Sequence, residues 1–205
     1  MARPREFDET AALEAAIECF WQRGYEATSI RDLATSMGVT APSLYNAFGD
    51  KQELFGRALK RYLDCTTRDR LRRLETSLAP KKAIRRFFAE IIDRSITDRK
   101  RKGCFLVNSA LDVAPHQAEF CALITEQFDE ITDFFKRCIL AAQADETAPR
   151  NVDADDAARL LLGLLLGIRV LARSNPSRRL LESVMRPALA LLDLPAQNRK
   201  KKRCL

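Results

Sequence analysis

The amino-acid sequence predicts an all-α protein. Apolar residues recur at intervals of three and four along most of the chain, which is the spacing of one face of an α-helix. Residues that cap helix N-termini precede several of these segments, as Asp8 and Asp50 do, and Gly24, Gly38 and Pro80 separate others. We therefore expect about nine helices, with a three-helix head at the N-terminus and a larger helical part after it.

The head contains two short helical segments joined by a tight turn. Residues 29–37 predict the first helix, Gly38 suits a helix C-terminus with positive φ, and Thr40 can cap the second helix. Leu44 and Phe48, four residues apart, point back to the core. This pattern is typical of a helix-turn-helix. The outward residues of the second helix are small or hydrogen-bonding, as a helix in a DNA major groove requires, and are Thr40, Ala41, Ser43, Tyr45 and Asn46.

Charge is unevenly distributed along the chain. Residues 1–61 carry eight Lys/Arg and nine Asp/Glu, whereas residues 68–102 carry thirteen and five. Phosphate contacts of the head must therefore come from a few placed groups rather than from a general positive field. Arg3 and Arg5 belong to a short arm that either is a frayed terminus or reaches DNA phosphate or a minor groove.

Several functional classes are not expected. The six cysteines form no C-x-x-C pair and no N-terminal signal peptide is present, which favours free thiols in a reducing cytoplasm. His116 is the single histidine, so neither a His-rich metal site nor a catalytic dyad with further ligands is available. We expect no enzyme activity, no metal and no cofactor. The longest apolar run, residues 160–168, is shorter than the roughly 20 residues that cross a bilayer, so no membrane partner is expected.

The helical pattern continues to residue 194. Residues 1–50 are expected to form the helix-turn-helix domain, residues 51–77 a connecting helix, residues 51–195 a regulatory and dimerisation domain, and residues 196–205 a basic disordered tail. Further helices are expected from Pro80, from about residue 103 to Pro115, and over 115–143, 153–173 and 176–194.

The helix expected over 153–173 is apolar nearly all round, so more than one of its sides must be buried. Gly163 and Gly167 would let a neighbouring helix approach closely. We expect a two-fold homodimer in which residues 153–173 and 176–194 form a four-helix bundle, the alternative being an ordinary core helix. A dimer would place two recognition helices about 34–36 Å apart, the spacing of a palindromic operator in double-stranded DNA.

The head resembles the DNA-binding head of the TetR family. The resemblance rests on Gly24-Tyr25, Thr28-Ser29-Ile30, Leu33-Ala34, Gly38-Val39, Leu44-Tyr45, Phe48 and Lys51-x-x-Leu54-Phe55, over roughly residues 8–60. It implies that Thr28, Tyr45, Asn46 and Lys51 contact DNA. Thr28 and Ser29 also suit helix capping, and the hydroxyls and amides there can hold a phosphate. Ala47 departs from the histidine that many members carry, so the operator sequence cannot be carried over.

A small-molecule effector is the second implication of the resemblance. Family members hold such ligands in their larger domain, and the middle helices of this chain are rich in phenylalanine. Each of these rings also suits an ordinary core, and His116 a structural role. The expected effector-binding residues are Phe88, Phe105, Phe120, Asn108 and His116.

Cys104 is a candidate sensor. It follows Arg99, Lys100, Arg101 and Lys102 and opens a helix, and cations and a helix N-terminus both stabilise a thiolate. The segment G-C-F-L-V-N-S-A-L is similar to one in a TetR subgroup that includes electrophile-responsive repressors. The alternative is a small residue at a helix start.

The sequence therefore predicts an all-α transcriptional repressor with a helix-turn-helix head and a larger ligand-binding and dimerisation domain. It would leave a palindromic operator when a small apolar ligand binds or when a thiol is modified. The alternative is a constitutive architectural DNA-binding protein without an effector.

Overall fold

The computed structural model describes residues 7–193 of the 205-residue chain, and every regular element in this part is helical. The elements are α1 Glu9–Arg23, α2 Ile30–Met37, α3 Ala41–Phe48, α4 Lys51–Tyr62, η1 Leu63–Arg68, α5 Asp69–Ser77, α6 Pro80–Thr97, α7 Phe105–Asp112, α8 Ala118–Ala144, α9 Ala154–Ser174 and α10 Arg178–Leu191. Counting α4, η1 and α5 as one continuous helix gives the nine that the sequence predicts for this part.

Local capping explains most of the helix starts. The Asp8 carboxylate accepts hydrogen bonds from the backbone N–H groups of Thr10 and Ala11. Asp50 and Glu53 form a reciprocal capping box at the start of α4. Asp153 caps α9 by accepting from Asp156 N at 2.9 Å. These bonds satisfy backbone donors that a helix N-terminus leaves without partners, which is why the sequence locates these starts well.

The connecting helix differs from the regular α-helix that the sequence predicts over 51–77. Its middle part, Leu63–Arg68, is a π-helix whose Leu63 and Thr67 are buried. The Thr66 hydroxyl donates to the carbonyl of Tyr62 at 2.6 Å. A side chain therefore bonds a backbone carbonyl at the point where the α-helix changes to the wider π-helix. Periodicity alone does not reveal such a local widening.

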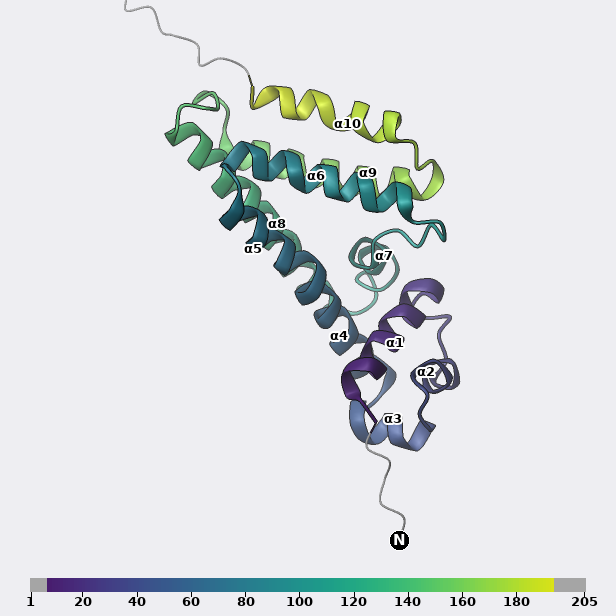
Figure 1. Ribbon diagram of the computed structural model, residues 1–205. Coiled ribbons are helices and arrows are strands. Elements are labelled where there is room, and N and C mark those ends of the chain that lie inside the picture. Colours follow the sequence, from purple (N-terminus) through teal and green to yellow (C-terminus); the bar gives the residue numbers. More distant parts are fainter. Residues whose placement is uncertain (1–6, 194–205) are drawn as a thin grey trace, which may run out of the picture. The chain divides into compact units, whose positions relative to one another are not determined.

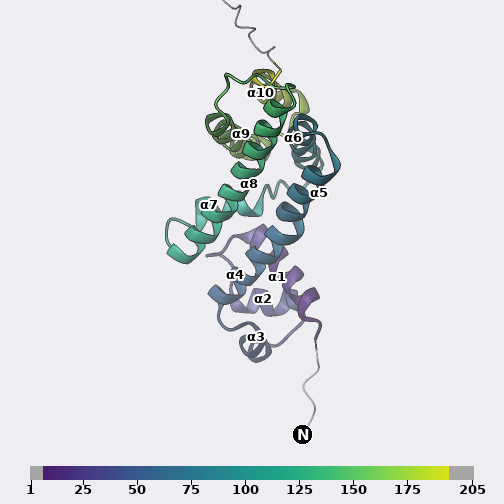
Figure 2. The same cartoon turned by 90° about the vertical axis from the view of Figure 1, so that its left-hand side faces the viewer.

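The chain forms two compact units. The first comprises the chain up to Asp69 together with Lys102–Gln127. Figures 1 and 2 both show α1, α2 and α4 packed together in this unit, with α3 at their end. Its core is an aromatic cluster contributed by α1, the α1–α2 turn, α4, α7 and α8, and its edge-to-face pairs include Phe20–Phe55, Tyr25–Phe120, Phe55–Phe105 and Trp21–Tyr62.

The second unit comprises Arg70–Arg101 and the chain from Phe128 onward. Figure 1 shows α6, α9 and α10 side by side in this unit. Phe87 and Phe88 of α6 pack on Phe134 and Phe135 of α8 in a buried group of four rings. None of the helices within residues 7–193 combines the length and the hydropathy needed to span a membrane.

Candidate nucleic-acid interface

The helix-turn-helix is built by α2, Gly38 and α3. Leu33 and Leu44 are fully buried on the inner faces of the two helices, and Met37 is nearly so. Gly38 has φ +68 and a left-handed conformation, while nothing lies within 4 Å of the position that a Cβ would take. The turn therefore requires glycine for its backbone conformation and not for space.

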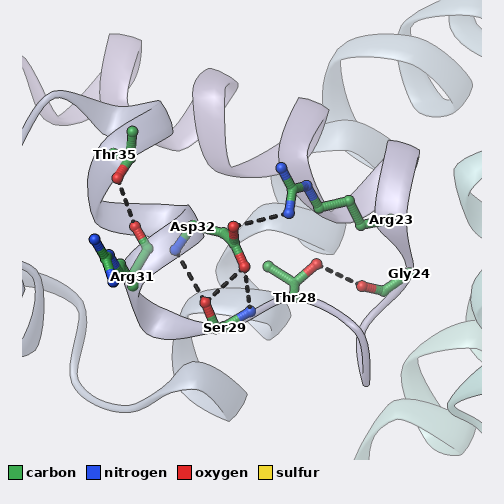
Figure 3. Close-up of polar contacts among 7 residues, drawn as sticks. All are labelled: Arg23, Gly24, Thr28, Ser29, Arg31, Asp32 and Thr35. Carbon is green, nitrogen blue, oxygen red and sulfur yellow. Dashed lines mark hydrogen bonds and ion pairs between the residues drawn. The ribbon is translucent and has the colours of Figure 1, made fainter.

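A hydrogen-bonded network fixes the start of α2 against the end of α1 (Figure 3). The Ser29 hydroxyl accepts from Asp32 N at 3.1 Å and donates to Asp32 Oδ2 at 2.6 Å, and Ser29 N donates to the same carboxylate. Arg23 Nη1 donates to Asp32 Oδ1 at 2.8 Å. The hydrogen bonds from Ser29, aided by the Arg23 charge, hold the pKa of Asp32 below its usual range. The network orients α2 relative to α1.

Thr28 lies inside the turn rather than on the surface. Its side chain is buried, and its hydroxyl donates to the carbonyl of Gly24 at 2.6 Å (Figure 3). Gly24 in turn ends α1 with φ +84. Thr28 therefore closes the α1–α2 turn through its hydroxyl, and its contact with DNA remains a prediction.

The recognition helix α3 presents the expected polar face. Tyr45 is 50% exposed although it is a large aromatic residue, and the neighbouring Asn46 is exposed as well. Thr40 caps the helix and lies 2.9 Å from Ser43 Oγ. Ala41 is half-buried at the first position. The sequence thus separates the inner and outer faces of α3 correctly.

Lys51 lies half-buried at the start of α4. Its ammonium lies 4.4 Å from the centroid of the Tyr25 ring and donates to the carbonyl of Glu26 at 3.4 Å. These contacts hold the cation against the α1–α2 turn. Arg3 and Arg5 lie outside the described residues.

Two cations of the head were not singled out from the sequence. Arg31 is exposed in the first turn of α2, and its carbonyl accepts a hydrogen bond from the Thr35 hydroxyl (Figure 3). Arg57 donates to the carbonyl of Ala47 at 2.8 Å and lies over the Phe48 ring at 4.5 Å. Arg31 could have been found by placing it opposite the buried face of α2, but the contact between Arg57 and the end of α3 depends on tertiary packing.

The expected effector residues fall into both units. Phe105, Phe120, Asn108, His116 and Cys104 belong to the first unit, whereas Phe88 belongs to the second. Phe105 and Phe120 are buried in the aromatic cluster, and Asn108 donates to the carbonyl of Lys102 at 2.8 Å. His116 is exposed.

Cys104 is half-buried and precedes the first residue of α7. Its sulfur lies 3.8 Å from the Tyr62 hydroxyl. The ammonium of Lys102, expected to support a thiolate, instead binds Glu18 at 2.7 Å and lies 4.2 Å from the centroid of the Trp21 ring. The loop that carries Cys104 is thus tied to α1 of the head by Lys102.

A cavity of about 610 Å³ lies within the first unit, between α4 and the beginning of α8. Of the expected effector residues, Phe120 alone contributes to its lining, which also includes Phe48, Gly56, Arg57, Lys60 and Leu123. Within residues 7–193, no three potential His, Cys, Asp or Glu ligands are grouped for a metal ion.

Two protein-family models match this chain. Residues 12–58 match the family described as bacterial regulatory proteins, tetR family. Residues 80–188, more than half of the chain, match the tetracyclin repressor-like C-terminal domain. The chain belongs to the TetR family. It is therefore a helix-turn-helix transcriptional regulator, as the resemblance of the head implied.

Two relatives within the TetR family match nearly their full length. The uncharacterized regulator YezE of Bacillus subtilis is 32% identical over 94% of this chain and 100% of its own. The repressor ComR of Escherichia coli is 30% identical over 94% of this chain and 90% of its own. A cysteine variant of the TetR regulator CifR, complexed with 26-bp operator DNA, is 32% identical with a TM-score of 0.81, over 92% of this chain and 98% of that one.

Proposed function

We propose that this TetR-family regulator is a homodimeric, cytoplasmic repressor that binds a palindromic operator and leaves it when an effector binds or Cys104 is modified. The observation that carries the proposal is the exposed polar face of α3, where Tyr45 and Asn46 project from the helix-turn-helix. The relatives support it, because ComR is named a repressor and the CifR variant was solved with operator DNA.

Tyr45 and Asn46 are assigned to base contacts, with Thr40, Ala41 and Ser43 against the adjacent backbone of the groove. Asn presents both a donor and an acceptor, which suits a bidentate contact with adenine. Lys51, Ser29 and Arg31 are assigned to phosphates, since they lie at or near helix N-termini. Thr28 supports these contacts by closing the turn behind them. Arg3 and Arg5 extend the footprint beyond the described residues.

The dimer interface is assigned to α9 and α10. Leu160 and Val170 of α9 and Leu191 of α10 are large apolar residues with 45%, 52% and 40% of their surface exposed in the single chain. Nothing lies within 4 Å of a Cβ position at Gly163 or Gly167. An open surface of this kind suits a second copy of the same two helices, which forms a four-helix bundle. Residues 1–50 then form the DNA-binding domain, 51–77 the connection, 51–195 the regulatory and dimerisation domain, and 196–205 a basic tail.

Release from DNA is assigned to the loop between α6 and α7. Cys104 is accessible and contacts Tyr62, and Lys102 two residues earlier holds Glu18 and Trp21 of α1. A bulky adduct on Cys104 would displace the loop and release this contact with the head.

Selection of bound duplexes from a random DNA pool tests the proposal. The wild-type protein should enrich a palindrome, and Asn46→Ala should relax the selection at defined positions. Arg150→Ala, a change at an exposed arginine between α8 and α9, is the matched control and should leave the selected sequence unchanged. Enrichment of no palindrome would contradict the repressor model. A palindrome that no electrophile or ligand releases would favour a constitutive DNA-binding protein instead.

A further inference from the structure

Arg169 is a cation buried inside the second unit. It belongs to α9, is 8% exposed, and its Nη1 donates to the Ser95 hydroxyl of α6 at 3.2 Å. Its Nε is buried and has no hydrogen-bond partner. Within residues 7–193, no carboxylate forms an ion pair with this guanidinium. A buried charge without a counter-charge is strongly unfavourable, so this position favours the binding of an anion.

Ser95 orients the guanidinium but cannot neutralise it. The Ser95 hydroxyl donates its proton to the carbonyl of Ile91 at 2.8 Å, and a lone pair therefore receives the Arg169 donor. Ser95 is itself buried. This bond fixes the Nη1 end of the guanidinium. The opposite edge, formed by Nε and Nη2, is the edge that binds a carboxylate through two parallel hydrogen bonds.

The surroundings of this pair are apolar. Phe88 and Ile92 precede Ser95 on α6 by seven and three residues, which places all three on one face of the helix, and they are buried. Ile168 and Ala172 flank Arg169 on α9 and are buried as well. These neighbours favour an anion that carries an apolar body, and Phe88 was already expected to line an effector site.

The partner subunit does not supply this anion in the proposed dimer. An α-helix turns about 100° per residue, so Arg169 and Gly167 lie about 200° apart around α9. Gly167 belongs to the open face assigned to the second copy. Arg169 consequently points away from that face, toward α6 of its own chain.

We propose that Arg169, oriented by Ser95, binds the carboxylate of an apolar organic acid. This site deepens the proposed function by giving the effector a chemical class. The binding of the acid does not depend on the proposed function, but the release of DNA on binding rests on it. The acid carboxylate is ionised at neutral pH and supplies the missing charge, while its hydrocarbon part lies against the apolar residues of α6 and α9.

Calorimetry and thermal melting of the full chain without DNA test the site. Octanoate and benzoate should bind and raise the melting temperature, whereas the uncharged analogues 1-octanol and benzamide should not. Arg169→Met should weaken binding of the acids at least about tenfold, because it removes a charge-assisted bond. Arg150→Met, at an exposed arginine between α8 and α9, is the matched control and should bind as the wild type does.

If the acids do not bind, if their neutral analogues bind as tightly, or if Arg169→Met keeps the affinity of the wild type, the assignment is wrong. Arg169→Lys keeps the charge without the paired donors and should also bind more weakly, which provides the test if the methionine variant does not fold. DNA binding by the unliganded wild-type protein is measured separately. If this protein does not bind DNA, the proposed function is wrong, but the assignment of the acid site is unaffected.

Discussion

Replacement of Gly163 and Gly167 on α9 distinguishes a dimer interface from a solvent-exposed face. Both glycines lie inside the helix, and a Cβ at either position meets nothing within 4 Å in the single chain. Glycine in a helix interior is about 1 kcal/mol less favourable than alanine. On a solvent-exposed face, the double alanine variant would therefore be about 2 kcal/mol more stable than the wild type.

A partner helix reverses this expectation. Small residues let two helix axes approach closely, and added side chains would push the axes apart and reduce the packing of Leu160 and its counterparts. We therefore expect the double alanine variant to dimerise more weakly and Gly167→Leu to be largely monomeric. The monomer should also bind a palindromic operator poorly, because one recognition helix reads only one half-site.

Sedimentation velocity over a range of concentrations measures the dimer, and thermal melting measures the stability. Ala141→Leu introduces a leucine at an exposed position of α8 and serves as the control, since it should leave the dimer intact. A Gly167→Leu protein that stays dimeric, together with a double alanine variant whose melting temperature rises, would refute the assigned interface.

Three other outcomes follow from the same structure. Lys51→Ala should weaken binding to all DNA sequences and reduce the salt dependence of DNA binding by about one counterion. Asn46→Ala should instead cost about 1–3 kcal/mol of binding free energy at particular base pairs. DNA titrations at several salt concentrations measure both effects. Burial raises the pKa of the Cys138 thiol to about 12. Mass spectrometry should therefore find Cys138 unmodified by N-ethylmaleimide at neutral pH, while the half-buried Cys104 reacts. Equal rates of modification of the two thiols would contradict this. The hydrogen bonds from Arg137 hold the pKa of Glu75 below its usual range, so this pair stabilises the fold at neutral pH and the stabilisation is lost as the pH falls through that lowered pKa. Urea unfolding at neutral and acidic pH should show that acidification lowers the free energy of unfolding less in Glu75→Gln than in the wild type.

Much of the head could be predicted because its signals are local. Thr40, Asp50 and the glycine at position 38 act within a few residues of themselves, and they mark the ends of α2, α3 and α4 correctly. The alternation of buried Leu44 with exposed Tyr45 also follows directly from helical periodicity.

Other features depend on segments that are far apart in the sequence. The π-helical part of the connecting helix, the burial of Thr28 and the contact of Arg57 with α3 all require neighbours that spacing does not reveal. Lys102 is the clearest case, because the charge run predicts a cation beside Cys104 whereas the folded chain directs it to Glu18, 84 residues away.

The helical class, the helix-turn-helix and the outward face of α3 follow from the amino-acid sequence, since capping, glycine conformation and periodicity are properties of short segments. Which charges are exposed and which are enclosed depends on how the helices pack. Arg169 shows the reason: an arginine beside an apolar run of a helix has the same local pattern whether it faces water or the interior, and the packing of α6 against α9 alone encloses it with Ser95.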